Sequence, residues 1–470
     1  MRSRRPATVC GLVAALIVGA CVHLRAPATG PDEWEQVASP SAVGFSAAGL
    51  EDAFRRAEAA GSAAVMVVYR GHVLAAWGDV ERELELHSVR KSLYGALYGV
   101  AVDRGVIDLE ATLAELEIQD LSPLTPLERS ARVADLLAAR SGVYHPSAYS
   151  PSDMDEGLPP RGSQPPSATF YYNNWDFNVA AAVLERQTGE DLDELFARWI
   201  AEPIGMQDWR PGDSYEVFEP RTSRWPAHTF RMSTRDLARF GQLILQQGAW
   251  RGEQVLPREW VVRSTRIVTG FEDGSGYGLL WWVYPPGVLS ADRYPTTRRF
   301  EVIQARGSGG QALFVVPQAE LALVHRGDTD RGEGVSGAAV WGILEAVLDA
   351  RTRPAGGPAE LVPLAPRPLP PVSGSDPLRL ESVDVVEVAE LIGRYELAPG
   401  VFAEVFPFEG RAYIEVPGEG EAELFALADG LYALRVEPGV RIAIERNDEG
   451  RVAALVVTLG ERRMRATRVP

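Results

Sequence analysis

Lysine is almost missing from this 470-residue chain, although charged residues are not rare in it. Among its 47 Lys and Arg residues, Lys91 is the only lysine. Arginine stays protonated in proteins, whereas a lysine that is removed from water can lose its proton and act as a base. The use of lysine at position 91 therefore indicates proton transfer rather than a simple need for positive charge.

Cysteine and positive charge are both scarce, and each shortage excludes a class of function. The two cysteines, Cys10 and Cys21, lie within the first 30 residues. The rest of the chain can therefore form no disulfide, thiol nucleophile or cysteine-bound metal site. The formal net charge is −17. Because nucleic-acid binding depends on clustered Lys and Arg, this charge argues against a nucleic acid as partner.

Asparagine occurs four times, and three of the four, Asn173, Asn174 and Asn178, fall within six positions. An amide both donates and accepts hydrogen bonds, so this cluster suits the orientation of a substrate or a catalytic side chain. A polar turn that caps the following helix is the alternative. The six histidines are scattered without the spacing of metal ligands, and no G-x-S-x-G motif is present. We expect no metal and no organic cofactor.

A serine stands three residues before the single lysine. Leu93, Leu97 and Val100 recur at helical spacing after it, so Ser88 and Lys91 are expected one turn apart on the same helix face. A serine hydroxyl becomes a good nucleophile when a neighbouring base takes its proton, and helix N–H groups favour a developing oxyanion. The alternative is that Ser88 caps the helix and Lys91 is a surface charge.

Residues 1–30 have the organisation of a targeting segment. Arginines at positions 2, 4 and 5 precede an apolar stretch at 9–20 that is short for a membrane span. The sequence Val18-Gly19-Ala20-Cys21 then resembles a bacterial lipobox, which predicts lipidation of Cys21. We expect an exported lipoprotein of the periplasm or cell envelope that is anchored to the membrane by lipid. An ordinary signal peptide or an uncleaved anchor is the alternative.

Residues 31–351 carry the patterns of a mixed α/β domain. Helices are predicted at 47–60, 88–105, 125–140, 179–187, 234–247 and 337–348, and strands at 63–69, 72–77, 276–283, 313–316 and 321–325. The segment 143–168 is rich in Pro, Ser, Gly and Tyr and predicts a long loop.

A second domain is predicted at the C-terminal end. Residues 352–384 are Pro-rich without periodicity, which is typical of a linker. Residues 385–470 follow with short alternating segments at 403–408, 412–416, 430–436, 440–445 and 452–459. This pattern predicts a small antiparallel β domain.

Three motifs follow one another along the chain: Ser88-x-x-Lys91, Tyr172-Asn173-Asn174 and Ser308-Gly309-Gly310. Their order and spacing resemble the serine beta-lactamase and penicillin-binding-protein superfamily. The closest resemblance is to class C beta-lactamase-related esterases and 6-aminohexanoate-dimer-hydrolase-like enzymes, over about residues 45–350. This resemblance implies an antiparallel sheet flanked by helices and a helical lobe, with the active site between them. Residues from 390 onward are similar to the lipocalin-like β domain of some such hydrolases.

The resemblance also implies roles for individual residues. Ser88 would be the acylated nucleophile, and Lys91 would help to remove its proton. Tyr172 would activate Ser88 and later the deacylating water, while Asn174 would contact the lysine and the substrate. A register that starts at Tyr171 also fits the second motif.

The third motif is expected to supply the oxyanion hole. The backbone N–H of Ser88 and that of Gln311, which follows Ser308, Gly309 and Gly310, would be its donors. Penicillin-recognising members have lysine where this chain has Ser308, and Arg306 is the cation nearest in sequence. The lack of that lysine favours uncharged esters or amides as substrates.

We therefore expect an exported serine hydrolase that acts on a small-molecule or peptide ester or amide. A D-alanyl-D-alanine carboxypeptidase or a weak beta-lactamase is the second interpretation. A catalytically weak sensor that binds peptidoglycan or another ligand is a third, from a different class. The sequence predicts no oligomeric state.

Overall fold

The structure is a computed structural model. It describes residues 33–151, 154, 156–332, 334–353, 359–370, 380–417, 420–427, 430–436, 439–459 and 462–469. The predicted targeting segment, with Cys21, lies outside the described residues, so its lipidation stays a prediction. In the part that is described, no helix is both long and apolar enough to cross a membrane.

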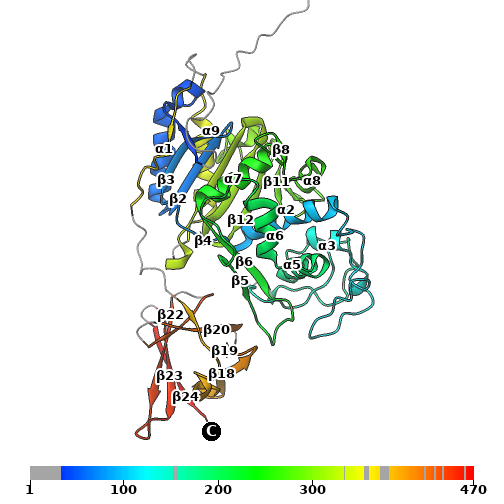
Figure 1. The fold of residues 1–470 in the computed structure, drawn as a ribbon, viewed down its shortest axis with the longest axis vertical. Helices are drawn as coiled ribbons and strands as arrows, with labels where there is room; N and C mark the ends of the chain where they lie inside the picture. The colour runs from blue at the N-terminus through cyan, green and yellow to red at the C-terminus, as the bar shows by residue number, and fades with distance from the viewer. Residues whose placement is uncertain are drawn as a thin grey trace, which may run out of the picture.

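A ten-stranded sheet in the described residues forms the body of the first domain, in the order β15-β1-β3-β2-β14-β13-β12-β11-β10-β9 (Figure 1). Neighbouring strands are antiparallel except β1 and β3, which are parallel. The strands are β1 Glu35–Val37, β2 Ala64–Tyr69, β3 His72–Gly78, β9 Thr269–Gly270, β10 Gly276–Tyr277, β11 Trp282–Tyr284, β12 Val302–Gly307, β13 Gln311–Val316, β14 Leu321–Arg326 and β15 Leu361–Pro363.

Helices cover both faces of this sheet (Figure 1). Alternate side chains of β2 enter different cores, because successive residues of a strand point to opposite faces. Val65 and Val67 pack with α1 (Ala47–Ala59) and α9 (Gly337–Asp349), whereas Met66 and Val68 pack with α7 (Thr234–Leu245). Because helices cover both faces, the central strands consist of consecutive apolar residues rather than of alternating apolar and polar residues.

A helical lobe adjoins the sheet on the α7 side. Its central helix, α2, is buried from Arg90 to Ala101. The lobe contains α2 Arg90–Asp103, α3 Val133–Leu137, α5 Asn174–Thr188, α6 Leu192–Phe196 and α8 Arg258–Ser264. A small sheet in the order β4-β6-β5 borders it, with β4 Leu84–Glu85, β5 Ser214–Val217 and β6 Ala227–Met232, and β7 Ala249–Trp250 pairs with β8 Glu253–Gln254.

Two of the predicted elements are wrong, each for a tertiary reason. The helix predicted at 125–140 is a 3-10 turn, Glu128–Ser130, followed by the short helix α3. Between the two, Ala131 O accepts from Leu113 N at 2.8 Å, and at the first residue of α3 Val133 N donates to Ala111 O at 3.0 Å. These bonds to another segment hold the backbone out of a helix, and they override the local helix propensity.

The strand predicted at 276–283 is instead a hairpin of β10 and β11. Leu280 has a φ of +66°, in the left-handed region. Its N–H donates to Leu137 O at 3.0 Å, and its carbonyl accepts from Ser92 Oγ at 2.7 Å. The turn is therefore fixed by contacts with the helical lobe, which the local sequence does not contain.

The C-terminal domain is all β, as predicted. Its described strands are β16 Glu381–Ser382, β17 Gly393–Ala398, β18 Val401–Phe408, β19 Arg411–Val416, β20 Gly420–Ala426, β21 Tyr432–Leu434, β22 Val440–Arg446, β23 Val452–Leu459 and β24 Arg462–Arg468. They form one sheet, and an additional pairing of β20 with β21 closes it into a barrel. The predicted fold class, a mixed α/β domain followed by a small β domain, is confirmed.

Two glycines of α2 give a matched test of lobe packing. A Cβ added at Gly99 would lie 2.4 Å from Trp260 Cδ1, whereas at Gly95 the nearest atom is 3.7 Å away. Trp260 cannot easily retreat, because its Nε1 donates to Gly95 O at 2.7 Å. We expect Gly99→Ala to lower the free energy of unfolding by about 1–3 kcal/mol.

The control, Gly95→Ala, should be neutral or stabilising by up to about 1 kcal/mol, because alanine favours helix. Denaturant titration of both variants measures the difference. Equal stability of the two would contradict the packing of α2 on Trp260.

Candidate active site

Ser88 and Lys91 meet where strand β4 leads into helix α2. Ser88 lies in a 3-10 turn, His87–Val89, and Lys91 lies in the first turn of α2. Lys91 Nζ and Ser88 Oγ are hydrogen-bonded at 2.6 Å. Lys91 is 1% exposed. The alternative interpretation of Lys91 as a surface charge is therefore wrong.

The surroundings of Lys91 favour the neutral amine. Burial, and then repulsion by the Arg90 guanidinium, lower the pKa of Lys91 well below its usual value. The rings of Tyr172 and Phe177 lie 4.8 Å from Nζ, and such contacts favour the charged form to a smaller extent. Among the described residues, no carboxylate forms an ion pair with Lys91, so no such pair raises its pKa and favours the protonated form. The side chain is thus suited to accept a proton from Ser88.

Tyr172, rather than Tyr171, faces the nucleophile. The Tyr172 ring lies 4.8 Å from Lys91 Nζ, the atom that is bonded to Ser88 Oγ. Burial raises the pKa of Tyr172, while the Ser88 hydroxyl and the charges of Arg90 and Arg306 act in the opposite direction. Tyr171 instead donates its hydroxyl to Met154 O at 2.8 Å. The structure thus brings Ser88, Lys91 and Tyr172 together around one hydroxyl group.

The three clustered asparagines hold the long loop. Each donates its Nδ2 to a backbone carbonyl of that loop: Asn173 to Val143 O at 3.0 Å, Asn174 to Tyr149 O at 2.6 Å and Asn178 to Ala148 O at 3.0 Å. Asn173 also caps α5, because its Oδ1 accepts from Trp175 N at 3.1 Å. No hydrogen bond between Asn174 and Lys91 occurs among the described residues. The buried Oδ1 of Asn174 has no hydrogen-bond partner among the described residues.

The glycine that lies closest to the nucleophile turn is Gly307, directly before the third motif, and not Gly309 or Gly310 within it. Cβ atoms added at Gly309 and Gly310 would meet Thr329 and Val335, away from Ser88. A Cβ added at Gly307 would lie 2.6 Å from Leu86 O and 3.0 Å from Ser88 N. The last residue of β12 is therefore the close approach to the nucleophile, and it needs glycine for that reason.

Gln311 is buried in the network behind this hairpin. Its Nε2 donates to Gly327 O at 2.8 Å, and its Oε1 accepts from Arg326 Nε at 2.7 Å. Ser308 is exposed, and its N–H follows Gly307 by one peptide bond. The N–H of Ser308 is therefore a second candidate for the backbone donor beside Ser88, and the role of the Gln311 N–H stays a prediction.

A family model described as Beta-lactamase matches residues 47–327, which is more than half of the chain. The chain belongs to the beta-lactamase family. The predicted resemblance to serine beta-lactamases and penicillin-binding proteins is therefore confirmed.

Individual relatives of this beta-lactamase-family chain are distant. An uncharacterized protein of Alkalihalophilus pseudofirmus is 21% identical over 294 residues, which are 56% of this chain and 82% of that protein. A Bacillus anthracis structure, named for 6-aminohexanoate-dimer hydrolase, is 21% identical, covers 63% of this chain and 80% of its own, and has a TM-score of 0.49. A class C beta lactamase from Rhodobacter sphaeroides is 17% identical, with coverages of 64% and 98% and a TM-score of 0.46. An octameric penicillin-binding protein homologue from Pyrococcus abyssi is 16% identical, with coverages of 89% and 99% and a TM-score of 0.47.

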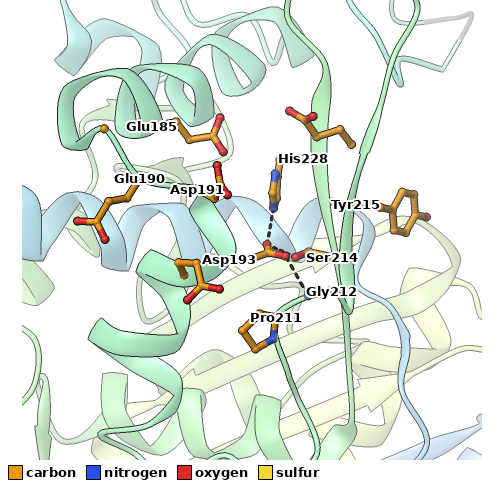
Figure 2. A pocket seen from close by; sticks show the side chains of 12 residues that line it. Glu185, Glu190, Asp191, Asp193, Pro211, Gly212, Ser214, Tyr215 and His228 are labelled. Carbon is orange, nitrogen blue, oxygen red and sulfur yellow. Dashed lines mark hydrogen bonds and ion pairs between the residues drawn. The ribbon is translucent and has the colours of Figure 1, made fainter. Parts of the chain in front are cut away.

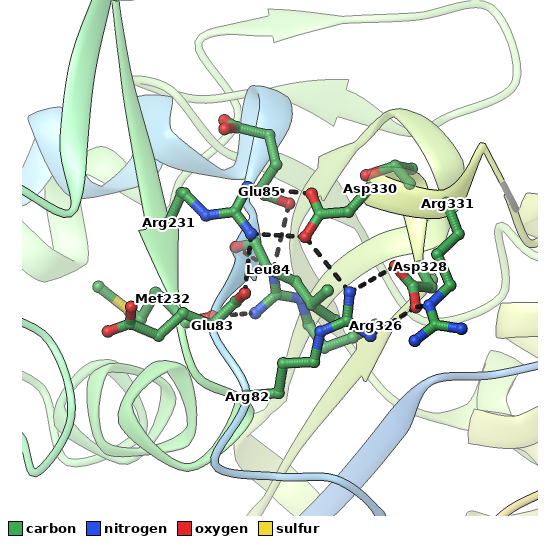
Figure 3. A network of polar contacts seen from close by, with 12 residues as sticks. Arg82, Glu83, Leu84, Glu85, Arg231, Met232, Arg326, Asp328, Asp330 and Arg331 are labelled. Atoms are coloured by element: carbon green, nitrogen blue, oxygen red, sulfur yellow. Dashed lines mark hydrogen bonds and ion pairs between the residues drawn. The ribbon is translucent and has the colours of Figure 1, made fainter. Parts of the chain in front are cut away.

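A buried arginine fixes the strand that precedes the nucleophile in this family member (Figure 3). Arg326 donates to Leu84 O at 2.7 Å, to Glu85 O at 3.2 Å and to Met232 O at 2.6 Å. Burial, and then repulsion by Arg231, lower the pKa of Arg326 to about 9, so it stays charged at neutral pH. The carbonyls of β4 and β6 are thereby tied to the end of β14.

Ion pairs surround this arginine on its outer side (Figure 3). Arg82 Nη1 binds Asp328 Oδ2 at 2.6 Å, and Arg231 Nη1 binds Asp330 Oδ1 at 2.9 Å. Arg231 also donates to Glu83 O at 2.9 Å. Charge-assisted bonds of this kind are about twice as strong as neutral ones. The strand β4, which leads to Ser88, is therefore held firmly in place.

His87, directly before Ser88, was not singled out by the sequence. Its Nδ1 is hydrogen-bonded to the Tyr149 hydroxyl and its Nε2 to Thr329 Oγ1, both at 2.9 Å. Burial, and then the Arg90 charge, lower the pKa of His87 to about 4, so the ring is neutral at neutral pH. Because both ring nitrogens are engaged by Tyr149 and Thr329, His87 fixes the turn, and it has no hydrogen bond to the Ser88 side chain among the described residues.

A cluster of half-buried aromatic rings packs beside Tyr172. Trp282 stacks on Tyr172 with ring centroids 5.7 Å apart, and Phe170 and Phe271 lie 6.2 and 6.1 Å from the Trp282 ring. The exposed guanidinium of Arg306 covers Trp282 at 3.7 Å. Apolar rings and the guanidinium of Arg306 thus lie on the Trp282 side of Tyr172.

An acidic hollow lies elsewhere in the lobe, between α5, α6 and the β5–β6 hairpin (Figure 2). It measures about 690 Å³, and its carboxylates are Glu185, Glu190, Asp191, Asp193, Glu194 and Glu216. Burial would raise the pKa of Asp193, but its bonds with His228 and with its other donors hold that pKa below the usual value. No cluster of three metal-binding side chains occurs among the described residues. Neither Ser88 nor Lys91 lines this hollow.

Two glycine variants test which part of the hairpin touches Ser88. Gly307 has a φ of −136°, so alanine fits its backbone, and a side chain is opposed by the contacts with Leu86 O, His87 Cβ and Ser88 N in the nucleophile turn. Because misplacement of reacting groups by about 1 Å can cost about a hundredfold in rate, we expect Gly307→Ala to slow acylation of Ser88 about tenfold or more. The rate of labelling by a fluorophosphonate measures this loss.

The matched control is Gly310→Ala, in the same hairpin. Its φ of +83° and its contact with Val335 O should lower the thermal stability, but the labelling rate of the folded protein should stay within about threefold of wild type. A larger loss of rate at Gly310 than at Gly307 would favour Gln311 as the oxyanion donor.

Proposed function

We propose that this chain is a serine hydrolase that forms an acyl-enzyme on Ser88 and releases it by hydrolysis. The observation that carries the proposal is the 2.6 Å contact between Ser88 Oγ and Lys91 Nζ, with the lysine buried and without an acidic partner among the described residues. A buried amine with a lowered pKa beside a hydroxyl is the arrangement that activates a serine nucleophile.

In the acylation step, Ser88 Oγ attacks the substrate carbonyl as its proton passes to Lys91, directly or through the Tyr172 hydroxyl. The bond to the leaving group then breaks, and that group takes up the proton. The N–H groups of Ser88 and of either Ser308 or Gln311 would stabilise the tetrahedral oxyanion. In the second step a water molecule attacks the acyl carbon as its proton passes to the same pair. The bond to Ser88 Oγ then breaks, Oγ takes up that proton, and the acid product is released. Because Lys91 must be neutral, the rate should fall as pH is lowered through its pKa.

The substrate that we favour is an uncharged ester or amide with an apolar group. Phe170, Phe271 and Trp282 supply apolar surface, and Ser308 lacks the charge that a lysine would provide there. Arg306 favours the second candidate, a carboxypeptidase or beta-lactamase, because its exposed guanidinium lies on Trp282. Turnover of nitrocefin or a D-Ala-D-Ala peptide faster than of any p-nitrophenyl ester would select that candidate.

The cellular setting is a proposal as well. The pattern of residues 1–30 supports export and lipidation at Cys21, with the hydrolase domain outside the cytoplasm. Mass spectrometry of the mature N-terminus tests it, since a lipidated Cys21 would be the first residue.

Ser88→Ala should abolish covalent labelling by a fluorophosphonate and all hydrolysis, because the attacking oxygen is gone. The companion variant Lys91→Arg keeps the positive charge but cannot take the proton, so the hydrolysis rate should fall by about 10²–10⁴-fold. Intact-protein mass spectrometry and a p-nitrophenyl ester assay measure the two effects.

Circular dichroism should show that both variants stay folded. Residual labelling of Ser88→Ala would move the nucleophile to another residue. A wild-type protein that is never acylated would instead favour the ligand-binding sensor.

A further inference from the structure

Tyr149, in the long loop, is held at four points beside the nucleophile turn. Its hydroxyl is hydrogen-bonded to His87 Nδ1 at 2.9 Å, its N–H donates to Glu219 Oε1 at 2.8 Å, and its carbonyl accepts from Asn174 Nδ2 at 2.6 Å. The Arg90 guanidinium lies 5.3 Å from its ring. With a φ of +60°, this tyrosine takes a backbone conformation that costs free energy and persists only where its surroundings fix it.

The hydroxyl of Tyr149 acts on the residue next to Ser88. His87 has a φ of +48°, and its two ring nitrogens are both engaged, one by Tyr149 and the other by Thr329. The rings of His87 and Tyr149 are parallel, with an interplanar angle of 4°. A shift of Tyr149 would therefore release one side of His87 and change the direction of the turn that carries the Ser88 hydroxyl.

Glu219, which binds the Tyr149 backbone, belongs to a loop that also holds the C-terminal domain. We call residues 218–222, between β5 and β6, the docking loop. Arg221 in this loop binds Glu404 through two bonds of 3.0 and 3.1 Å and Glu415 through one of 2.5 Å. Its N–H donates to Glu421 Oε2 at 3.0 Å. Three carboxylates of the barrel thus converge on one arginine.

Apolar contacts accompany these ion pairs. The Arg221 guanidinium lies 3.8 Å from the Phe406 ring, and Phe218 lies 5.8 Å from Phe408. Glu219 Oε2 faces the barrel, since a Cβ added at Gly420 would lie 3.7 Å from it. The other oxygen of the same carboxylate, Oε1, accepts from the N–H of Tyr149.

We propose that Tyr149 is a positioning residue for Ser88, and that the docked C-terminal domain sets its position through the docking loop. This inference rests on the proposed function. The β domain is then a working part of the hydrolase, because its release would loosen Glu219, Tyr149 and His87 in turn. The chain of contacts is continuous from the barrel to the residue before the nucleophile.

Charge reversal at Arg221 is the sharpest way to loosen the docked domain. A single exposed ion pair contributes little, but Arg221→Glu places a fourth carboxylate among three, where like charges repel. Arg221 lies outside the catalytic machinery, so the variant retains every group that touches substrate. The matched control is Arg446→Glu, because Arg446 pairs with Glu390 inside the C-terminal domain.

A double-mutant cycle tests the inference in the full-length protein. The second-order rate of Ser88 acylation by a fluorophosphonate is measured for wild type, Arg221→Glu, Tyr149→Phe, the double variant and Arg446→Glu. We expect each of the first two substitutions to slow acylation by about 3- to 30-fold, and the double variant to be no slower than the slower single variant. For a p-nitrophenyl ester, kcat should fall while KM stays within about twofold. Arg446→Glu should match wild type.

Small-angle scattering reports whether the C-terminal domain is released. If Arg221→Glu stays docked, Phe218→Ala is added to remove the ring contact with Phe408. Wild-type rates in a released variant would overturn the inference, and so would effects that simply multiply in the double variant. Failure of the wild-type chain to be acylated at all would instead overturn the proposed function, and this inference with it.

Discussion

The burial of one lysine without an acidic partner among the described residues is the constraint on which the rest of this site depends. An ammonium group in such a place is costly, and this cost lowers the pKa of Lys91 well below its usual value. The amine is held 2.6 Å from the Ser88 hydroxyl. An apolar residue that filled the same space would give a more stable protein. Retention of the lysine therefore has a cost in stability, as is typical of functional sites.

Arginine and lysine have different tasks in this structure, and this difference accounts for the scarcity of lysine. Arginine can be buried and stay charged when several carbonyls accept its five N–H groups, as Arg326 does with the carbonyls of β4 and β6. Arg82 and Arg231 extend the same network through Asp328 and Asp330. The structural cations are therefore arginines, and they fix the backbone against which the one proton-transferring lysine is placed.

The sequence predicted correctly those residues and helices that are marked by a short motif or by a local pattern of caps and apolar residues. Ser88, Lys91 and Tyr172 stand in short motifs, and helices such as α7 and α9 carry caps and apolar periodicity of their own. It failed where distant segments decide the backbone. The contact of Gly307 with Ser88 depends on how β12 lies beside the nucleophile turn, and Ala131 leaves its predicted helix because of Leu113. Tyr149 gave no signal, because its importance comes from His87, Asn174 and Glu219, which meet only in the folded chain.

The most direct test of this account is the ionisation of Lys91 itself. Because the chain has one lysine, protein grown with lysine labelled with 15N at its side-chain nitrogen gives one side-chain NMR signal, which can be followed against pH. The account predicts that this signal titrates well below about 10.4, the ordinary pKa of lysine, and that the amine is neutral where the enzyme works. A lysine that titrates at its ordinary value would contradict the central claim, because a permanently protonated Lys91 cannot take the Ser88 proton.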